Sequence, residues 1–230
     1  MLIENETILA QVPLKIQGYS NKTYLLKTEK KEYILRLFQQ EDINRKQEYA
    51  IHELASKENL TSTIIYHDEN RMITSFIEGV HKEKLVGKEL KLLAKVLKKL
   101  HSLPFCNNSI ILNIKENSKE TFDAFNIIEN SEKVLVLCHN DLNPKNIIFN
   151  SLPAYPKLID WEYAGVNDCY FDLASVCVEF YLGTEEEKFF LNAYFNKSYN
   201  QEKLDAYKII YKHLCKEWFI ALENSGYKSL

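Results

Sequence analysis

Two stretches of the sequence decide the fold: His139-Asn-Asp-Leu-Asn-Pro-Lys-Asn146 and Leu158-Ile-Asp-Trp-Glu-Tyr-Ala-Gly165. In the first, Asp141 and Asn146 stand five residues apart on a polar loop between two apolar runs. In the second, Asp160 ends another short apolar run, 14 residues after Asn146. A loop with an acid and an amide, beside a strand tip with a second acid, can converge on one point.

Such a set of side chains is typical of phosphoryl transfer. The reaction needs a carboxylate that orients or deprotonates an attacking hydroxyl, and oxygen ligands for a Mg²⁺ ion that bridges the nucleotide phosphates. Because Mg²⁺ prefers oxygen donors and keeps several waters, one Asp and one Asn suffice as protein ligands. The spacing therefore predicts Asp141 as the catalytic residue and Asn146 with Asp160 as the metal ligands.

The same residues carry a resemblance to a known family. Asp141 to Asn146 matches the D-x-x-x-x-N spacing of the kinase catalytic loop, and Asp160 stands in place of the metal-binding Asp of D-F-G. The form found here, with IDWEYAG followed by NDCYFDLAS, is similar to bacterial choline/ethanolamine kinases within the aminoglycoside phosphotransferase superfamily. The resemblance implies ATP as phosphate donor and choline or ethanolamine as acceptor. Its specific motifs are confined to residues 138–182.

Composition fits an ordinary globular protein. The chain has 230 residues, 46% of them hydrophobic, and a formal charge of −3, which gives no general attraction to nucleic acid or to anionic membranes. Five widely spaced cysteines fit neither a zinc site nor a disulfide framework. The N-terminus is acidic where a signal peptide is basic. We expect a cytoplasmic protein with no nucleic-acid or membrane partner; the oligomeric state is unknown.

Hydrophobic periodicity predicts an α+β fold with two lobes, a bilobal protein-kinase-like fold. The strongest single signal is a helix over 89–101, where leucines recur at helical spacing before Pro104. A small β-rich N-terminal lobe is expected over 1–79, to bind the nucleotide, and a larger, mainly helical C-terminal lobe over 80–230, to carry catalysis and the acceptor. The other expected elements are strands within 12–38, 63–66, 72–77, 134–138, 147–149 and 157–160, and helices over 42–57, 118–129 and from 171 onward.

The sequence contains neither of the glycine-rich motifs that bind nucleotide phosphates, GxGxxG and GxxxxGK(S/T). The turn Gly18-Tyr-Ser-Asn-Lys-Thr23 stands where the family has its phosphate-covering loop, so Ser20 and Asn21 are candidate nucleotide contacts, although a plain hairpin turn is equally compatible with it. Arg36 matches the strand position at which related kinases carry a cation that steadies phosphates. Its expected partner is Glu48 on the following helix, with Glu53 as the alternative.

The acceptor site is predicted from the resemblance and from the chemistry of a quaternary ammonium, which aromatic faces and a carboxylate bind. Glu179 is the expected carboxylate and Trp218 the main aromatic face, with Trp161 or Tyr181 as further members; the alternative is that these aromatic residues belong to the core, which is the more frequent role of aromatics at helical spacing. Related enzymes carry a W-x-x-W pair here, whereas Cys215 stands three residues before Trp218.

Other interpretations stay open. An aminoglycoside or thiamine kinase would use the same chemistry on another acceptor, and an aminoglycoside site should be lined by several acids. The run Glu185-Glu-Glu187 has the pattern of an exposed helix start instead. A non-catalytic pseudokinase is the rival from a different class, and the presence of all three predicted catalytic and metal-binding side chains weighs against it. Asp172 is expected to brace the catalytic loop from the next helix.

Overall fold

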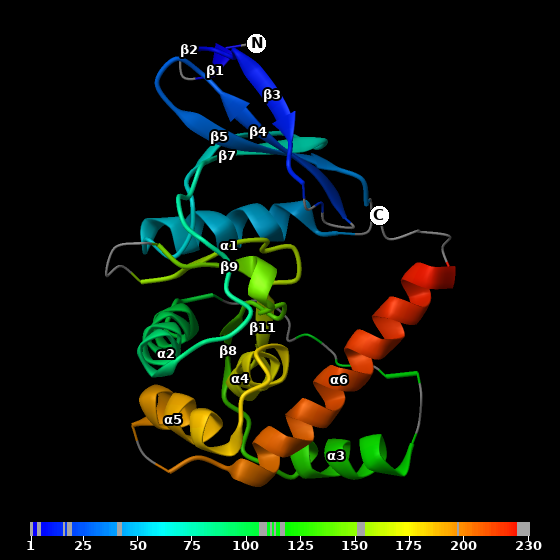
Figure 1. The fold of residues 1–230 in the computed structure, drawn as a ribbon. Helices are drawn as coiled ribbons and strands as arrows, with labels where there is room; N and C mark the ends of the chain where they lie inside the picture. The colour runs from blue at the N-terminus through cyan, green and yellow to red at the C-terminus, as the bar shows by residue number, and fades with distance from the viewer. Residues whose placement is uncertain are drawn as a thin grey trace. The chain divides into compact units, whose positions relative to one another are not determined.

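The computed structural model describes residues 2–3, 6–15, 17, 20–40, 43–105, 110, 112, 114–115, 118–150, 155–196 and 198–224. The chain forms two compact units. The first unit combines Met1–His81 with Ile147–Tyr163, and the second combines Lys82–Asn146 with Ala164–Leu230. Strands dominate the first unit and helices the second (Figure 1). The expected α+β class is confirmed.

A five-stranded antiparallel sheet forms most of the first unit, in the order β3-β4-β5-β7-β6. A separate short pair, β1 with β2, lies near the N-terminus of the chain. The bounds are Leu2–Ile3 (β1), Glu6–Thr7 (β2), Ala10–Pro13 (β3), Asn21–Lys27 (β4), Glu32–Phe38 (β5), Ile64–His67 (β6) and Arg71–Ser75 (β7). The strands expected over 12–38 and 63–77 are therefore present.

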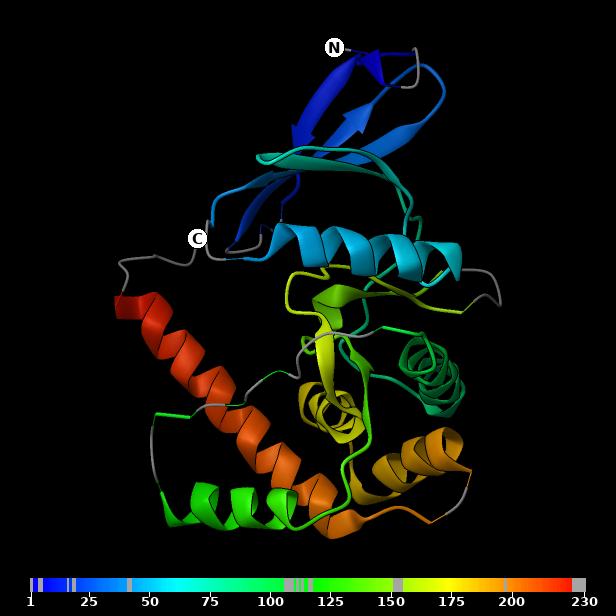
Figure 2. The same cartoon turned by 180° about the vertical axis from the view of Figure 1, so that it is seen from behind.

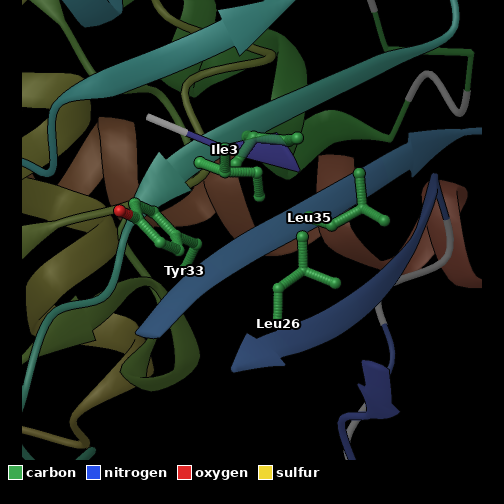
Figure 3. Packing of buried hydrophobic residues seen from close by; sticks show 5 residues of the cluster. Ile3, Leu26, Tyr33 and Leu35 are labelled. Carbon is green, nitrogen blue, oxygen red and sulfur yellow. The ribbon is translucent and has the colours of Figure 1, made fainter. Parts of the chain in front are cut away.

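The two faces of β5 have different roles. Tyr33 and Leu35 point to one face and pack with Leu26 and Ile3 in a buried apolar cluster (Figure 3). Because successive side chains of a strand alternate between faces, Arg36 points the other way, where it meets helix α1. One face of the strand thus holds the core, and the other holds the charged site described below.

Helix α1 spans Arg45–Lys57 and begins at Asn44, whose side chain accepts a hydrogen bond from the backbone N–H of Gln47 at 3.2 Å. Such a cap satisfies one of the amides that a helix start leaves unpaired. The buried side chains of the helix are Glu48, Ile51, His52 and Ala55. Their spacing of three, four and seven residues places them on one face.

The segment 147–163 returns to the first unit. Its strands β9 (Ile147–Ile148) and β10 (Lys157–Leu158) pair with each other. Leu158 N–H donates to Leu60 O at 2.9 Å, and Phe149 N–H donates to Val80 O at 2.9 Å. This segment was expected in the C-terminal lobe, 80–230. Its backbone hydrogen bonds instead join it to the N-terminal part of the chain.

The second unit consists of five helices and one strand pair within the described residues. Helix α2 packs on α5, and α6 packs on both α3 and α4 (Figure 2). The bounds are Gly87–His101 (α2), Lys119–Glu129 (α3), Leu135–Cys138 (β8), Pro144–Asn146 (a 3₁₀ turn, η1), Gly165–Asp168 (β11), Cys169–Glu179 (α4), Thr184–Phe195 (α5) and Gln201–Asn224 (α6).

The leucine pattern of α2 is confirmed, because Leu90, Leu93, Leu97 and Leu100 are all buried. Strand β11 was not expected; it pairs with β8 in an antiparallel ladder. Of the helices in the described part of the chain, none is both long and apolar enough to cross a bilayer.

Candidate active site

The predicted catalytic loop follows strand β8 and closes on itself. Asn146 Nδ2 donates to Asp141 Oδ2 at 2.6 Å and to Asp141 O at 2.9 Å, and Asn143 Nδ2 donates to Asp141 Oδ1 at 3.0 Å. The 3₁₀ turn at Pro144–Asn146 brings the amide back toward the acid. The five-residue spacing therefore does place Asp141 and Asn146 in contact.

The buried carboxylate of Asp172, in the first turn of α4, braces this loop. It accepts hydrogen bonds from the backbone N–H groups of His139 and Asn140, each at 2.8 Å. On its other side, His101 Nε2 lies 3.0 Å from Asp172 Oδ2, and His101 Nδ1 lies 2.7 Å from the hydroxyl of Tyr194. The bracing role expected for Asp172 is confirmed, and α2, α4 and α5 all contribute to it.

In the first unit, Arg36 lies at the centre of a charged cluster. Its guanidinium donates to Glu48 Oε1 at 2.7 Å, to Asp160 Oδ1 at 2.6 Å and to Glu162 Oε2 at 3.4 Å. Arg45 Nη1 donates to the second oxygen of Glu48 at 2.6 Å. Glu48, rather than the alternative Glu53, is thus the helix partner of Arg36, and Asp160 from the second motif belongs to the same cluster.

Charge and burial oppose each other in this cluster. Burial by itself lowers the pKa of Arg36, but Asp160, Glu48 and Glu162 raise that pKa above its ordinary value. Burial by itself raises the pKa of Glu48, yet Arg36 and Arg45 hold it below its ordinary value. Glu162 differs, because burial and the neighbouring Asp160 raise its pKa more than Arg36 lowers it. The cluster has more acids than cations around one guanidinium, which suits it to a further cation.

The side chains expected to contact the nucleotide at the start of β4 are buried. Asn21 Nδ2 donates to Glu162 Oε2 at 3.0 Å, and a hydrogen bond from the Ser20 side chain also reaches Glu162. Both residues tie this turn to the segment after Asp160 through Glu162. The preceding residues of the predicted phosphate-covering turn, Gly18 and Tyr19, lie outside the described residues.

Glu179, the carboxylate expected to bind the acceptor, ends helix α4 and lies close to α6 in the second unit. Tyr211 donates its hydroxyl to Glu179 Oε1 at 3.0 Å. Burial raises the pKa of Glu179 above its ordinary value; the Tyr211 hydrogen bond lowers it, and the negative charge of Asp141 raises it further. No ion-pair partner of Glu179 is found among the described residues.

The three candidate aromatic residues have different surroundings. Trp218 stands seven residues after Tyr211 on α6, hence on the same face of that helix, and 36% of it is exposed. Tyr181 is 85% exposed and has a left-handed backbone, with φ of 52°. Trp161 lies in the first unit with 0% exposure, and its Nε1 donates to Thr61 Oγ1 at 3.2 Å. We therefore treat Trp161 as a core residue.

Two residues that contact the predicted site residues were not predicted from the sequence, Arg45 and Tyr211. Arg45 clamps Glu48 and lies over the Phe38 ring, 3.9 Å from its centroid, but on a helix start it has the pattern of an exposed cation. Tyr211 contacts Glu179 although 32 residues separate them. Its position seven residues before Trp218 was the one available signal.

Asn146 and Asp160 each have an oxygen atom of the kind that Mg²⁺ prefers. Asn146 uses its amide N–H groups for Asp141, so its carbonyl oxygen Oδ1 is the atom that can ligate. Asp160 uses Oδ1 for Arg36, which leaves Oδ2 as its donor. Asp160 and Asn140 also have left-handed backbones, with φ of 67° and 65°. Non-glycine residues in that region are uncommon and cluster at functional sites.

Part of the chain matches a family of known proteins. Residues 126–208, from α3 into α6, match the family model described as "Phosphotransferase enzyme family". The chain thus resembles that family over this segment. It is similar to choline and ethanolamine kinases. Protein LicA of Haemophilus influenzae is 38% identical over 85 residues, which are 37% of this chain but only 31% of that protein. Human ethanolamine kinase 2 is 47% identical over 49 residues, 21% of this chain and 13% of that enzyme.

Solved structures share the whole fold of this chain. Choline kinase LicA from Streptococcus pneumoniae superposes with a TM-score of 0.82 at 23% identity, covering 97% of this chain and 88% of that one. A LicA structure in complex with AMP has a TM-score of 0.78 at 25% identity and covers 99% and 88% of the two chains. The fold is that of the kinase-like phosphotransferases.

Proposed function

We propose that this protein transfers the γ-phosphate of ATP to the hydroxyl of a small amino alcohol, either choline or ethanolamine. The observation that carries the proposal lies within the second unit: the half-buried carboxylate of Glu179 has no cationic partner among the described residues, and it lies near enough to Asp141 for the two charges to interact. An amino alcohol separates its hydroxyl from its amine by two carbon atoms. It therefore needs a base and a counter-ion that are close neighbours.

Asp141 is the proposed base. Its carboxylate accepts amide N–H bonds on both oxygens, which fix its orientation. It would accept a hydrogen bond from the acceptor hydroxyl and take its proton as the new P–O bond forms and the bond to ADP breaks. The carboxylate is aimed before substrate arrives, because Asp172 fixes the backbone of the two residues that precede it.

We propose that Asn146 and Asp160 hold Mg²⁺. The ion, when bound, neutralises the charge that develops on the transferred phosphoryl group. Arg36, braced by Glu48, would then steady the nucleotide phosphates, with Ser20 and Asn21 at the start of β4. The AMP complex of LicA supports an adenine nucleotide as the donor. Because the reaction consumes ATP, we expect it to take place in the cytoplasm.

Glu179 and Trp218 are the proposed binding site for the cationic head of the acceptor. A carboxylate supplies the counter-charge, and an aromatic face attracts a cation by roughly 0.5–2 kcal/mol. Tyr181 is a further candidate because its ring is exposed two residues after Glu179. The names of the relatives, choline kinase and ethanolamine kinase, support this class of acceptor.

An aminoglycoside acceptor, which carries several ammonium groups, is less well supported. The acidic run that begins α5 serves other contacts: Glu186 accepts a hydrogen bond from Gly183 N–H at 2.9 Å, and Glu187 pairs with Lys208 at 2.7 Å. These acids stabilise the helix and its packing. A single half-buried carboxylate near Asp141 matches an acceptor with one positive charge.

The direct test is a panel of acceptors. ADP release by the purified protein should be measured with choline, ethanolamine, thiamine and kanamycin, each with Mg²⁺ and ATP. We expect turnover with choline or ethanolamine. Turnover with kanamycin or thiamine alone would overturn the acceptor assignment. Binding of ATP without turnover of any acceptor would identify a pseudokinase.

A further inference from the structure

Tyr211 holds the acceptor carboxylate from the neighbouring helix. Its hydroxyl donates to Glu179 Oε1 at 3.0 Å, and its ring packs edge-on against Phe171, with centroids 5.7 Å apart. The side chain is almost fully buried. Both ends of the tyrosine are therefore fixed, the ring in the core and the hydroxyl on the carboxylate.

Glu179 stands in an unfavourable place for a negative charge. It is the last residue of α4, where the helix dipole is negative, it is half-buried, and the charge of Asp141 acts on it. Among the described residues, the neutral hydroxyl of Tyr211 is the one side chain that donates a hydrogen bond to it. A carboxylate in such a place needs a fixed donor to keep its orientation, and a cation to compensate its charge.

We propose that Tyr211 is a positioning residue for the acceptor: its hydroxyl aims the Glu179 carboxylate at the ammonium group and keeps it ready as the counter-ion. This inference rests on the proposed function. It assigns no chemical step to Tyr211, which acts only through Glu179. Among the groups that face Glu179, Tyr211 and Cys215 come from α6 and Asp141 from the catalytic loop.

The first test is the variant Tyr211→Phe, which removes one oxygen and keeps the ring against Phe171. A hydrogen bond to a charged group is worth roughly tenfold or more in an equilibrium constant. We expect KM for the amino alcohol to rise about tenfold while kcat and KM for ATP stay within about twofold. Loss of the hydroxyl should also move the acidic limb of the kcat/KM profile to higher pH, because the Tyr211 hydrogen bond lowers the pKa of Glu179.

Tyr207→Phe is the matched control. Tyr207 lies one turn earlier on α6, is equally buried, and also packs edge-on against Phe171, with centroids 6.3 Å apart. A purely structural effect of losing a buried tyrosine hydroxyl from this helix should appear in both variants. We expect Tyr207→Phe to leave KM for the amino alcohol unchanged.

A double-mutant cycle with Glu179→Gln shows whether Tyr211 acts through Glu179. In the Glu179→Gln background, Tyr211→Phe should change acceptor KM by less than about twofold. The same tenfold rise in both backgrounds would overturn the proposal, and so would an unchanged KM in Tyr211→Phe alone. If the unmodified protein turns over no amino alcohol, the proposed function fails and this inference fails with it. Thermal unfolding of each variant shows whether it is folded. Calorimetry with ethanolamine measures acceptor binding directly, so that a folding defect is not mistaken for a change in KM.

Discussion

Among single residues, Asp141 has a side chain that is held on both of its carboxylate oxygens. Asn143 donates to one carboxylate oxygen and Asn146 to the other. Bonds to both oxygens fix the plane of the carboxylate. Two amides from the same short loop thus orient the proposed base while leaving it able to accept a proton.

Replacing this base should separate chemistry from nucleotide binding. We expect Asp141→Ala to lower turnover by a factor of about 10³, because no other group then accepts the hydroxyl proton, while ATP still binds. Turnover is followed as ADP release, and ATP binding as the displacement of a fluorescent nucleotide. Turnover within tenfold of the unmodified protein would remove Asp141 from the mechanism.

His52 should make the first unit sensitive to acid. Burial lowers its pKa to about 4 from an ordinary value near 6.5, and its Nε2 lies 2.9 Å from Ser62 O. The unfolded chain therefore binds a proton more readily than the folded one. The contribution of neutral His52 to the free energy of unfolding is fully present above about pH 6.5. It decreases as the pH drops towards 4, by up to about 3 kcal/mol.

The variant His52→Gln keeps a side-chain N–H for Ser62 O but cannot titrate in this range. Urea unfolding between pH 4.5 and 7, followed by Trp161 fluorescence in a Trp218→Phe background, should show a flatter pH dependence than the parent. Identical slopes for parent and variant would show that His52 does not cause the acid sensitivity.

At the scale of elements, helix α4 joins the two tasks of the second unit. Asp172 in its first turn holds the backbone before Asp141, and Glu179 at its end interacts with Asp141 itself. Seven residues separate the two acids, which places them on the same face of the helix. One helix therefore sets the relation between the proposed base and the proposed counter-ion, and helix α6 contacts its far end through Tyr211.

The connection after β7 depends on a glycine. Gly79 has φ of 158°, and a Cβ added there would lie 2.7 Å from Phe149 O. We expect Gly79→Ala to destabilise the first unit by about 1–3 kcal/mol, because backbone on the 147–163 segment must move. The matched control is Gly87→Ala, whose Cβ would meet only the Phe189 ring at 3.7 Å. Urea unfolding measures both variants, and equal stabilities would contradict the prediction.

The elements that local pattern determines were predictable. The leucine stripe of α2 and the apolar runs of β5 and β8 appear in the sequence without tertiary information. Strand β11 could not be predicted in this way. Its sequence, Gly165-Val-Asn-Asp168, has a single large apolar residue, and it forms a strand by pairing with β8. Likewise Asp141 and Asn146 could be predicted from spacing, whereas the contacts of Arg45 and Tyr211 depend on how separate elements pack.

For the whole molecule, the important feature is that the chain leaves the first unit, forms the catalytic loop in the second, and returns. The break falls between Asn146 and Ile147, immediately after the proposed metal ligand on that loop. The second proposed ligand, Asp160, follows β10 in the first unit, where Arg36 holds it. The two proposed metal ligands thus come from different units of the chain, whereas the proposed acceptor residues Glu179 and Trp218 both belong to the second.

This division predicts how removal of metal should act. Chelation by EDTA should abolish turnover, and added Mg²⁺ should restore it. Asp160→Asn should raise the Mg²⁺ concentration needed for half-maximal turnover about tenfold or more, because a neutral amide is a weaker ligand than a carboxylate, while ethanolamine still binds in the second unit. The matched control is Asp68→Asn, which alters another aspartate paired with an arginine in the first unit, Arg71 at 3.0 Å. A Mg²⁺ dependence that shifts equally in both variants would contradict the role of Asp160 as a ligand.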